Sequence, residues 1–420
     1  MEAIEQRVLE AIDLDGMLAY LGELVAIRSL SGQETPAQEH VAAQMERCGL
    51  ATDVWELDFK ALSRHRAFSI EVEREHGLGV VGVMGEEAGG RSLIFNGHVD
   101  VVPAGDEANW RYPPWQATFA NGNVYGRGAL DMKGGLCCAL FVAKALHEAG
   151  VRLKGKLIIE SVIGEEDGGV GTLAATVRGY RADGAVVVEP TELIVAPAQA
   201  GALNFRVTIP GHAAHGCVRE EGVSAIEKFI PIYQALMALE RDRNQRIKDP
   251  RFAMYNLPYA ICVGVIQGGN WASSVAESLT FEGRYGVAVG EETTAARRLL
   301  EETVAQAAQA DPWLRHHPPQ VEWWGGQFEA AGIAPDHPIA VTVSEAYQDI
   351  SGVPARLAGM TYGADMRLLV NEGQTPTVLF GPGDVRKAHQ PDEHVPIAEL
   401  EAAARTLALT ALRFCGYQQD

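Results

Sequence analysis

Short apolar runs that alternate with helical stretches are the feature that most constrains how this chain folds. The runs are rich in β-branched residues and match buried strands, at residues 76–85, 91–102, 155–164 and 183–190. Helical stretches at 134–150 and 172–180 separate the last three runs. Parallel strands need such crossover helices, which then cover both faces of the sheet. The pattern predicts an α/β domain with a mainly parallel sheet.

The middle of the chain follows a different pattern. Its strand signals lie at 201–216, 259–270 and 278–289, and its long helical periodicities at 222–245 and 291–310. Two helices and about four strands predict a compact α+β insert of roughly 130 residues, which is the size of a small domain. We therefore predict that residues 1–197 and 328–420 form the α/β domain and that 198–327 form the insert.

The two ends of the chain add helices to the α/β domain. Apolar residues recur at helical spacing over 4–27, which predicts a helix or a helix pair before the break at 29–35. Near the other end, a helix is predicted at 337–350, a buried strand at 375–383 and a closing helix at 396–416.

Composition excludes some functions. With 420 residues the chain is longer than a single core supports, and its net charge of −20 disfavours nucleic acid or an anionic membrane as a partner. The six cysteines have no CxxC spacing, which fits reduced thiols in a cytosolic protein. The acidic N-terminal residues do not match a signal peptide, and no apolar run is long enough to span a membrane. We expect a cytoplasmic protein.

Candidate metal ligands stand at the ends of the predicted strands or in adjacent loops. Imidazole and carboxylate ligands together suit Zn²⁺, Co²⁺ or Mn²⁺ better than Mg²⁺ or Ca²⁺. Taken singly, Asp131 could instead cap a helix, Glu166 could be a solvated carboxylate, and Glu189 could close a turn. Because strand ends meet at one edge of a parallel sheet, we interpret the whole set as a site. Its members are His98, Asp131, Glu165, Glu166, Glu189 and His389.

An ordered series of motifs runs through nearly the whole chain. The motifs are AIRSLSGQE, GHVDVVP, YGRGALDMKGG, GEED, EPTE, GHAAHG and AHQPDEHV. In this series the chain resembles the M20 family of metallopeptidases and deacylases. The resemblance implies a zinc-exopeptidase-like catalytic domain with an inserted α+β lid or dimerisation domain, and a homodimer formed through that insert.

The resemblance also implies a role for each candidate ligand. His98 and Glu189 would bind one divalent ion and Glu166 and His389 a second, with Asp131 bridging the two. Zinc is the expected metal, with cobalt or manganese as alternatives. Glu165 would be the general base. Asp100 shares a strand face with His98, so its carboxylate would accept the second ring N–H of that histidine and fix its tautomer.

The insert is expected to contribute a catalytic donor for the oxyanion, His215, and residues that bind the substrate. The resemblance aligns His215 with a lid histidine that often acts from the partner subunit, and Arg284 with an arginine that binds the substrate carboxylate. The segment before Arg284 departs from the family, since Ser274 and Ala276 stand where Asn and Pro are frequent. Asp365 and Arg367, in a motif that also departs from some relatives, are expected at the rim of the pocket. Trp110, Trp115 and Trp271 could line an acyl pocket or serve as core or interface anchors.

The leading hypothesis is a metal-dependent amidohydrolase that removes an N-acyl group from an amino acid or a related small amine. Two rivals use the same metals: a carboxypeptidase or dipeptidase, and a deformylase of an N-formyl heterocyclic amine. A silent binding protein on the same scaffold is the alternative from another class. Retention of Glu165 beside all five ligands favours an enzyme.

Overall fold

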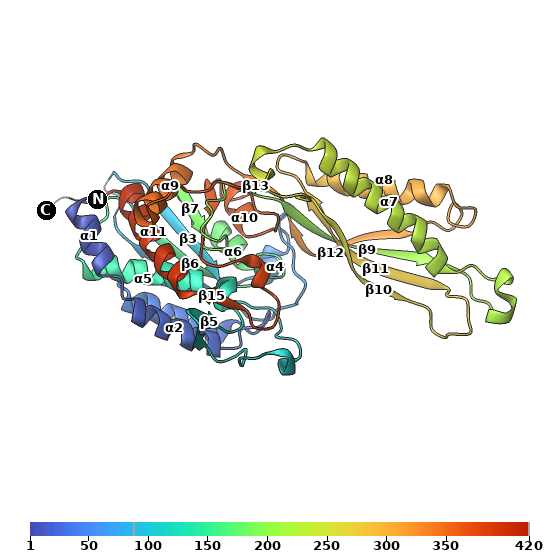
Figure 1. Ribbon diagram of the computed structural model, residues 1–420, viewed down its shortest axis with the longest axis horizontal. Coiled ribbons are helices and arrows are strands. Elements are labelled where there is room, and N and C mark those ends of the chain that lie inside the picture. The colour runs from blue at the N-terminus through green and yellow to red at the C-terminus, as the bar shows by residue number, and fades with distance from the viewer. Residues whose placement is uncertain (87–88, 419–420) are drawn as a thin grey trace. The chain divides into compact units, whose positions relative to one another are not determined.

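The computed structural model describes residues 1–86 and 89–418, which form two compact units (Figure 1). The first unit, called the catalytic unit below, comprises Met1–Ala198, Gly332–Gly359 and the chain from Ala364 onwards. The second, called the inserted unit, comprises Gln199–Ala331 with Met360–Gly363. Within the part of the chain that is described, no helix is both long and apolar enough to cross a membrane.

A six-stranded mixed sheet forms the centre of the catalytic unit, in the order β1-β2-β6-β3-β7-β14. Strands β6, β3, β7 and β14 run parallel, as predicted. The sequence pattern places β2 among the parallel strands, but it runs antiparallel to both β1 and β6. The bounds are β1 Ala51–Glu56, β2 Leu78–Met84, β3 Leu93–His98, β6 Leu157–Val162, β7 Gly184–Val187 and β14 Thr377–Leu379.

Helices cover both faces of this sheet because of the strand order. The chain passes from β3 through α5 (Gly134–Glu148) to β6 on one side, then through α6 (Val170–Arg178) back across β3 to β7. Right-handed crossovers in opposite directions place the two helices on opposite faces. Helix α5 is buried on nearly every side, because it contacts β3 and β6 of the sheet and also packs against α11 (Ile397–Cys415). The prediction of an α/β fold is confirmed.

The remaining helices of the catalytic unit are short or peripheral. The predicted N-terminal pair is present and is interrupted where Asp13 caps the second helix through the N–H of Gly16. Helix α9 packs on α11, and α10 packs on α6. Their bounds are α1 Ala3–Glu10, α2 Leu14–Ala26, α3 Thr35–Arg47, α4 Phe59–Leu62, α9 Pro338–Ser351 and α10 Met366–Asn371.

Small sheets and single-turn helices complete the chain. A three-stranded sheet has the order β15-β5-β4, and β8 pairs with β13. The strands are β4 Thr118–Ala120, β5 Asn123–Tyr125, β8 Ala198–Gln199, β13 Ala331–Gly332 and β15 His394–Pro396. The short helices are η1 Glu107–Asn109, η2 Ala129–Lys133, η3 Gly216–Glu221, η4 Pro250–Phe252 and η5 Val385–Lys387.

The inserted unit is an antiparallel sheet covered by two helices, as the sequence predicts. Its strands follow the order β10-β11-β9-β12, and both helices contribute apolar residues to one core with the sheet. Side chains of β9 alternate between buried and half-buried, which is the pattern of a strand with one face on a core. The bounds are β9 Gly201–Pro210, α7 Ala225–Arg246, β10 Ile261–Gly268, β11 Ser278–Val287, α8 Thr293–Gln309 and β12 Gln320–Phe328.

Strand β12 has no clear signal of its own in the sequence. Its residues include Gly325 and Gly326, and the pairing with β9 shifts register between Trp323 and Gln327. Glycines and a bulge interrupt the period of two that marks a strand in a sequence. The pairing with β9 therefore depends on the tertiary structure.

Candidate metal centre

Three adjacent parallel strands each deliver a candidate ligand at their carboxyl ends. His98 is the last residue of β3, Glu165 and Glu166 follow β6, and Glu189 follows β7. In the sheet β3 lies between β6 and β7, so these three ends are neighbours. Asp131 enters from η2, between β5 and α5. The structure thus brings the candidates of the catalytic unit to the carboxyl edge of the sheet, where open α/β sheets bind their ligands.

The carboxylate of Asp131 lies between two imidazole rings. Its Oδ1 is 3.2 Å from His98 Nε2, and its Oδ2 is 3.3 Å from His389 Nε2. His389 Nε2 also lies 3.1 Å from Glu166 Oε2. The His98 side chain is fully buried, whereas that of His389 is half exposed. Asp131 is therefore placed to serve two sites at once.

Two further carboxylates lie near the same ring nitrogen of His98. Glu189 Oε1 is 3.9 Å and Glu165 Oε2 is 4.0 Å from His98 Nε2. Two sets of three possible ligand atoms each fit within 4.8 Å: His98 with Asp131 and Glu166, and His98 with Glu165 and Glu189. Glu165 therefore belongs to the same cluster as the candidate ligands and is grouped with His98 and Glu189.

The electrostatics of the cluster follow from burial of several acids together. Burial raises the pKa of Glu165 well above its ordinary value, and repulsion from Glu189 raises it further. Burial likewise raises the pKa of Glu189. Burial disfavours the charged form of His98, yet the charge of Asp100 and the hydrogen bond with Asp131 hold its pKa well above the ordinary value. Hydrogen bonds with Asp131 and Glu166 raise the pKa of His389 to about 11.

This donor set fits divalent metal ions. The imidazoles of His98 and His389 converge with several buried carboxylates, although His389 itself is half exposed, and the acids outnumber the histidines. Buried charge of one sign needs a partner of the other, and a metal can take the place of the protons that these raised pKa values indicate. Mixed nitrogen and oxygen ligands suit Zn²⁺, Co²⁺ or Mn²⁺.

Asp100 supports the site differently from the prediction. The Nδ1 of His98 lies 2.9 Å from the main-chain carbonyl oxygen of Asp100 and 3.6 Å from its carboxylate. The carboxylate Oδ2 instead accepts a hydrogen bond of 3.0 Å from the N–H of Glu166. The expected carboxylate–imidazole hydrogen bond is thus replaced, because the turn after β3 brings the carbonyl closer to the ring. Asp100 consequently links the His98 strand end to the loop that carries Glu165 and Glu166.

Asp365 is buried and not exposed at a rim, and its charge acts on both Glu165 and Glu189, while its expected contact with substrate stays a prediction. The side chain is fully buried at the start of α10, and its Oδ2 accepts a hydrogen bond of 2.6 Å from the Thr172 hydroxyl. Burial raises the pKa of Asp365 to about 6. Arg367 is also buried and donates to the carbonyl of Gly168 at 2.7 Å. Packing of α10 against α6, which the local sequence does not specify, encloses both residues.

The other predicted substrate residues lie in the inserted unit. His215 is exposed, its Nδ1 accepts from the N–H of Cys217, and its backbone forms a β-bridge with Ser274. The structure therefore brings His215 and Ser274 together. Arg284 on β11 donates to the carbonyl of Thr361 at 2.7 Å, and burial lowers its pKa.

The structure also shows the surroundings of the three tryptophans and of Ala276. Trp271 is 74% exposed, so no core or pocket forms around it within the inserted unit. Trp110 is buried, with its indole N–H donating to Ala104. The indole N–H of Trp115 donates to Glu107 at the surface. Ala276 is buried beside α7 and accepts at its carbonyl from the N–H of Ala225.

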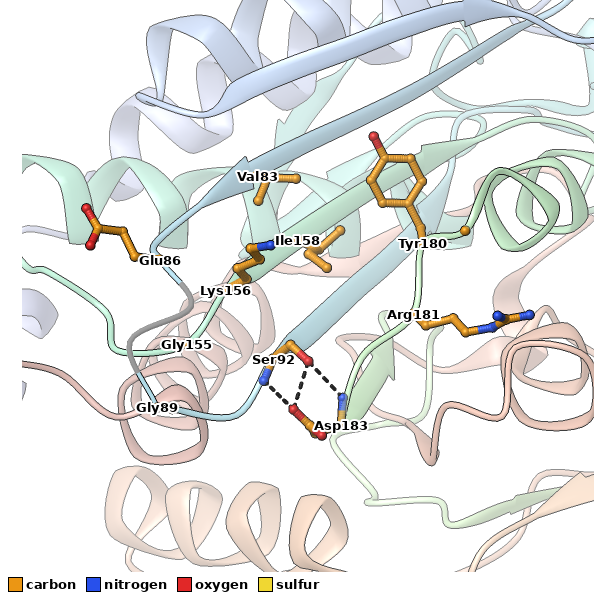
Figure 2. Close-up of a pocket in the computed structure, with 12 residues that line it drawn as sticks. Val83, Glu86, Gly89, Ser92, Gly155, Lys156, Ile158, Tyr180, Arg181 and Asp183 are labelled. Carbon is orange, nitrogen blue, oxygen red and sulfur yellow. Dashed lines mark hydrogen bonds between the residues drawn. The ribbon is translucent and has the colours of Figure 1, made fainter.

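A cavity of about 620 Å³ occurs at the opposite end of the same strands (Figure 2). Its lining includes Ser92, Lys156 and Asp183, which immediately precede β3, β6 and β7. The hydroxyl and main-chain N–H of Ser92 both donate to Asp183, as the dashed lines in Figure 2 show. The cavity therefore lies at the amino edge of the sheet, away from the candidate ligands.

Several buried charged residues hold the loops that carry the candidate ligands, and the sequence patterns do not predict this role for them. Arg74 donates to both Asp167 and Glu34, and all three side chains are buried. Asp167 directly follows Glu166. Glu393 is fully buried beside Asp131, although His389 is the residue of its motif that the sequence predicts at the site. A charged residue inside a motif is the available signal, but its burial depends on the fold.

Comparison with known proteins gives consistent relatives. The family model "Peptidase family M20/M25/M40" matches residues 94–413. An N-formyl-4-amino-5-aminomethyl-2-methylpyrimidine deformylase of Halalkalibacterium halodurans is 34% identical, over 77% of this chain and 79% of that protein. An acetylornithine deacetylase of Myxococcus xanthus is 28% identical, over 96% of this chain and 98% of that protein.

A solved dipeptidase structure has a similar fold. The dipeptidase Dug1p of Saccharomyces cerevisiae superposes with a TM-score of 0.75 at 13% identity, over 99% of each chain. At that identity the likeness concerns the fold alone. The family match and the deformylase relative together carry the assignment, and the predicted hydrolase of amide bonds is confirmed. This chain belongs to peptidase family M20/M25/M40 and is an amidohydrolase of that family.

Proposed function

We propose that this protein removes a short N-acyl group from a small amine with the help of two divalent metal ions. The observation that carries the proposal is the position of Asp131, whose two carboxylate oxygens face His98 and His389. We assign His98 and Glu189 to one ion, Glu166 and His389 to the other, and Asp131 to both. The distances of Glu189 to His98 and of Glu166 to His389 support this division.

Bound at these residues, the two ions would supply a water of lowered pKa and a polarised amide carbonyl. Glu165 takes the proton from the attacking water and transfers it to the leaving amine. Its position beside His98 supports this role, and burial together with repulsion from Glu189 raises its pKa above the ordinary value. Asp100 holds the Glu166 main chain and the His98 ring in place.

Two substrate classes follow from different observations. The partly buried guanidinium of Arg284 suits a substrate with a carboxylate, as in an N-acyl amino acid. The name of the relative with 34% identity favours an N-formyl heterocyclic amine instead, and Ser274 in place of the usual Asn is compatible with a changed recognition segment. We place the N-formyl amine as the second candidate.

We also propose a homodimer formed through the inserted unit, with His215 stabilising the oxyanion from the partner subunit. Strand β10 is at the edge of its sheet, and its outer half is exposed, including Val265 and Ile266. Helix α7 adds the exposed apolar residues Ile226 and Ile230. An exposed apolar edge strand readily pairs with another strand. The Ile266→Lys variant is expected to be monomeric by light scattering, and an active monomer would exclude a role for His215 in trans.

The composition supports a cytoplasmic enzyme. Its six cysteines are all unpaired in the structure, four of them buried. Thiols of this kind persist in a reducing compartment. We expect fractionation of cells to recover the protein with cytosolic markers.

The decisive experiment reconstitutes the metal-free protein with Zn²⁺, Co²⁺ or Mn²⁺ and counts the bound ions while assaying N-formyl, N-acetyl and N-succinyl amines beside dipeptides. Turnover that rises as the count approaches two per chain supports the proposal, and the preferred amide identifies the acyl group. Hydrolysis of dipeptides alone would refute the deacylase. Absence of bound metal in an active preparation would refute the ligand assignment.

A further inference from the structure

Glu393 is a fully buried carboxylate that contacts the backbone of the bridging ligand. Its Oε1 lies 3.2 Å from the N–H of Leu130 and 3.3 Å from the N–H of Asp131, and accepts a hydrogen bond from each. The main-chain carbonyl of Glu393 also accepts from the N–H of Gly126. The residue thus holds both the start and the centre of the loop that presents Asp131.

The other carboxylate oxygen of Glu393 is held by Arg127. This ion pair is buried on both sides. The guanidinium of Arg127 also donates to the carbonyl of Pro103 at 3.3 Å and lies 5.1 Å from the centre of the Trp110 ring. Arg127 therefore has fixed contacts on three sides, and Glu393 is fixed through it.

The direction of the Asp131 side chain depends on this arrangement. Its two carboxylate oxygens must face different imidazoles, and a small rotation of the Leu130–Asp131 peptide would move both oxygens together. A backbone N–H without a partner in a buried place is costly, so the two N–H groups keep the peptide directed at Glu393. The carboxylate belongs to the residue immediately before β15, which is a separate part of the chain.

We propose that Glu393 is a positioning residue that sets the Asp131 carboxylate between its two metal sites, with Arg127 holding Glu393 in turn. The inference rests on the proposed function for the identity of the metal sites. Glu393 is not one of the five assigned ligands, and its carboxylate oxygens are held by Arg127 and by the two main-chain N–H groups. Groups that orient metal ligands in this way commonly change metal affinity or activity by about one to two orders of magnitude when removed.

The test is the Glu393→Gln variant of the full-length protein. A glutamine presents its NH₂ group either to the two N–H donors or to Arg127, so one set of hydrogen bonds is lost. We expect Zn²⁺ affinity, measured by competition with a chromophoric chelator, to fall at least about tenfold. We expect kcat to fall with KM little changed, and hydrogen–deuterium exchange of residues 126–134 to accelerate in the metal-free protein.

Glu291→Gln is the matched control, because Glu291 pairs with the buried Arg243 within the inserted unit, whereas the assigned ligands belong to the catalytic unit. It is expected to lower the melting temperature but to leave Zn²⁺ affinity and exchange at 126–134 unchanged. If Glu393→Gln does not fold, Glu393→Asp replaces it, since the shorter side chain keeps the negative charge but withdraws its carboxylate by about 1.5 Å from the two N–H groups and from Arg127.

The possible outcomes distinguish failure of the positioning role of Glu393 from failure of the proposed function. Suppose that the wild-type protein binds Zn²⁺ and hydrolyses an amide. A folded Glu393 variant with the same Zn²⁺ affinity and the same exchange then overturns the role of Glu393 alone. Wild-type protein that binds no divalent metal overturns the proposed function, and the exchange of residues 126–134 then still decides whether Glu393 holds the Asp131 loop. Slower wild-type exchange than variant exchange supports the positioning role.

Discussion

A buried carboxylate behind the metal centre should make the stability of this protein fall as the pH rises. Glu160 lies on β6 opposite Asn96 of β3 and is fully buried. Its Oε2 accepts a hydrogen bond of 2.9 Å from the Asn96 amide, while its Oε1 has no hydrogen-bond partner among the described residues. Burial, with a smaller contribution from the charge of Asp365, raises the pKa of Glu160 from 4.5 to about 7.

The sign of the effect follows from proton binding. Between pH 4.5 and about 7 the folded protein binds more protons at Glu160 than the unfolded chain, so the free energy of unfolding falls as pH rises. The contribution is fully present below pH 4.5 and is lost above about 7. A difference of this size corresponds to about 3 kcal/mol, at about 1.4 kcal/mol for each pH unit.

The Glu160→Gln variant isolates this contribution. Glutamine keeps an oxygen for Asn96 and has no charge to bury, so the variant should be more stable than the wild type by about 3 kcal/mol at pH 8 and nearly equal to it at pH 5. Urea unfolding at both values measures the difference. Glu10→Gln, on the exposed surface of α1, serves as the control and should give the same small difference at each pH. An equal effect of Glu160→Gln at pH 5 and pH 8 would show that the carboxylate is not held in its protonated form.

Four other perturbations have defined outcomes. Glu165→Gln should retain both metals by elemental analysis while kcat falls by about two to four orders of magnitude, and an unchanged rate would remove it as the base. Chelation should abolish hydrolysis, and Zn²⁺, Co²⁺ or Mn²⁺ should restore it; persistent activity in metal-free protein would contradict the mechanism. Arg74→Met leaves Glu34 and Asp167 buried without their partner and should cost about 3 to 5 kcal/mol in urea unfolding, far more than Arg178→Met at the exposed surface. Arg284→Lys should raise KM for substrates with a carboxylate and leave KM for neutral N-formyl amines unchanged in steady-state kinetics.

The location of the candidate site follows from local sequence patterns. Each apolar run predicts a strand, each intervening helix makes the strands parallel, and parallel strands place their carboxyl ends at one edge. The sequence alone therefore groups three of the candidate ligands, His98, Glu166 and Glu189, because each stands at or just after the end of an apolar run that predicts a strand. The direction of β2 cannot be predicted in the same way, because its apolar pattern is the same for either direction of pairing.

The sequence by itself determined the two kinds of fold, the order of the ligand motifs and the family to which the chain belongs, because these depend on periodicity and on residues close together in the chain. Tertiary structure alone decided the contacts of Asp100, the burial of Asp365 and the attachment of Glu393 to the Asp131 loop. Glu393 and Asp131 are 262 residues apart. The hydrogen bond between them depends on how separate elements pack, and side-chain burial of this kind leaves no period in the sequence.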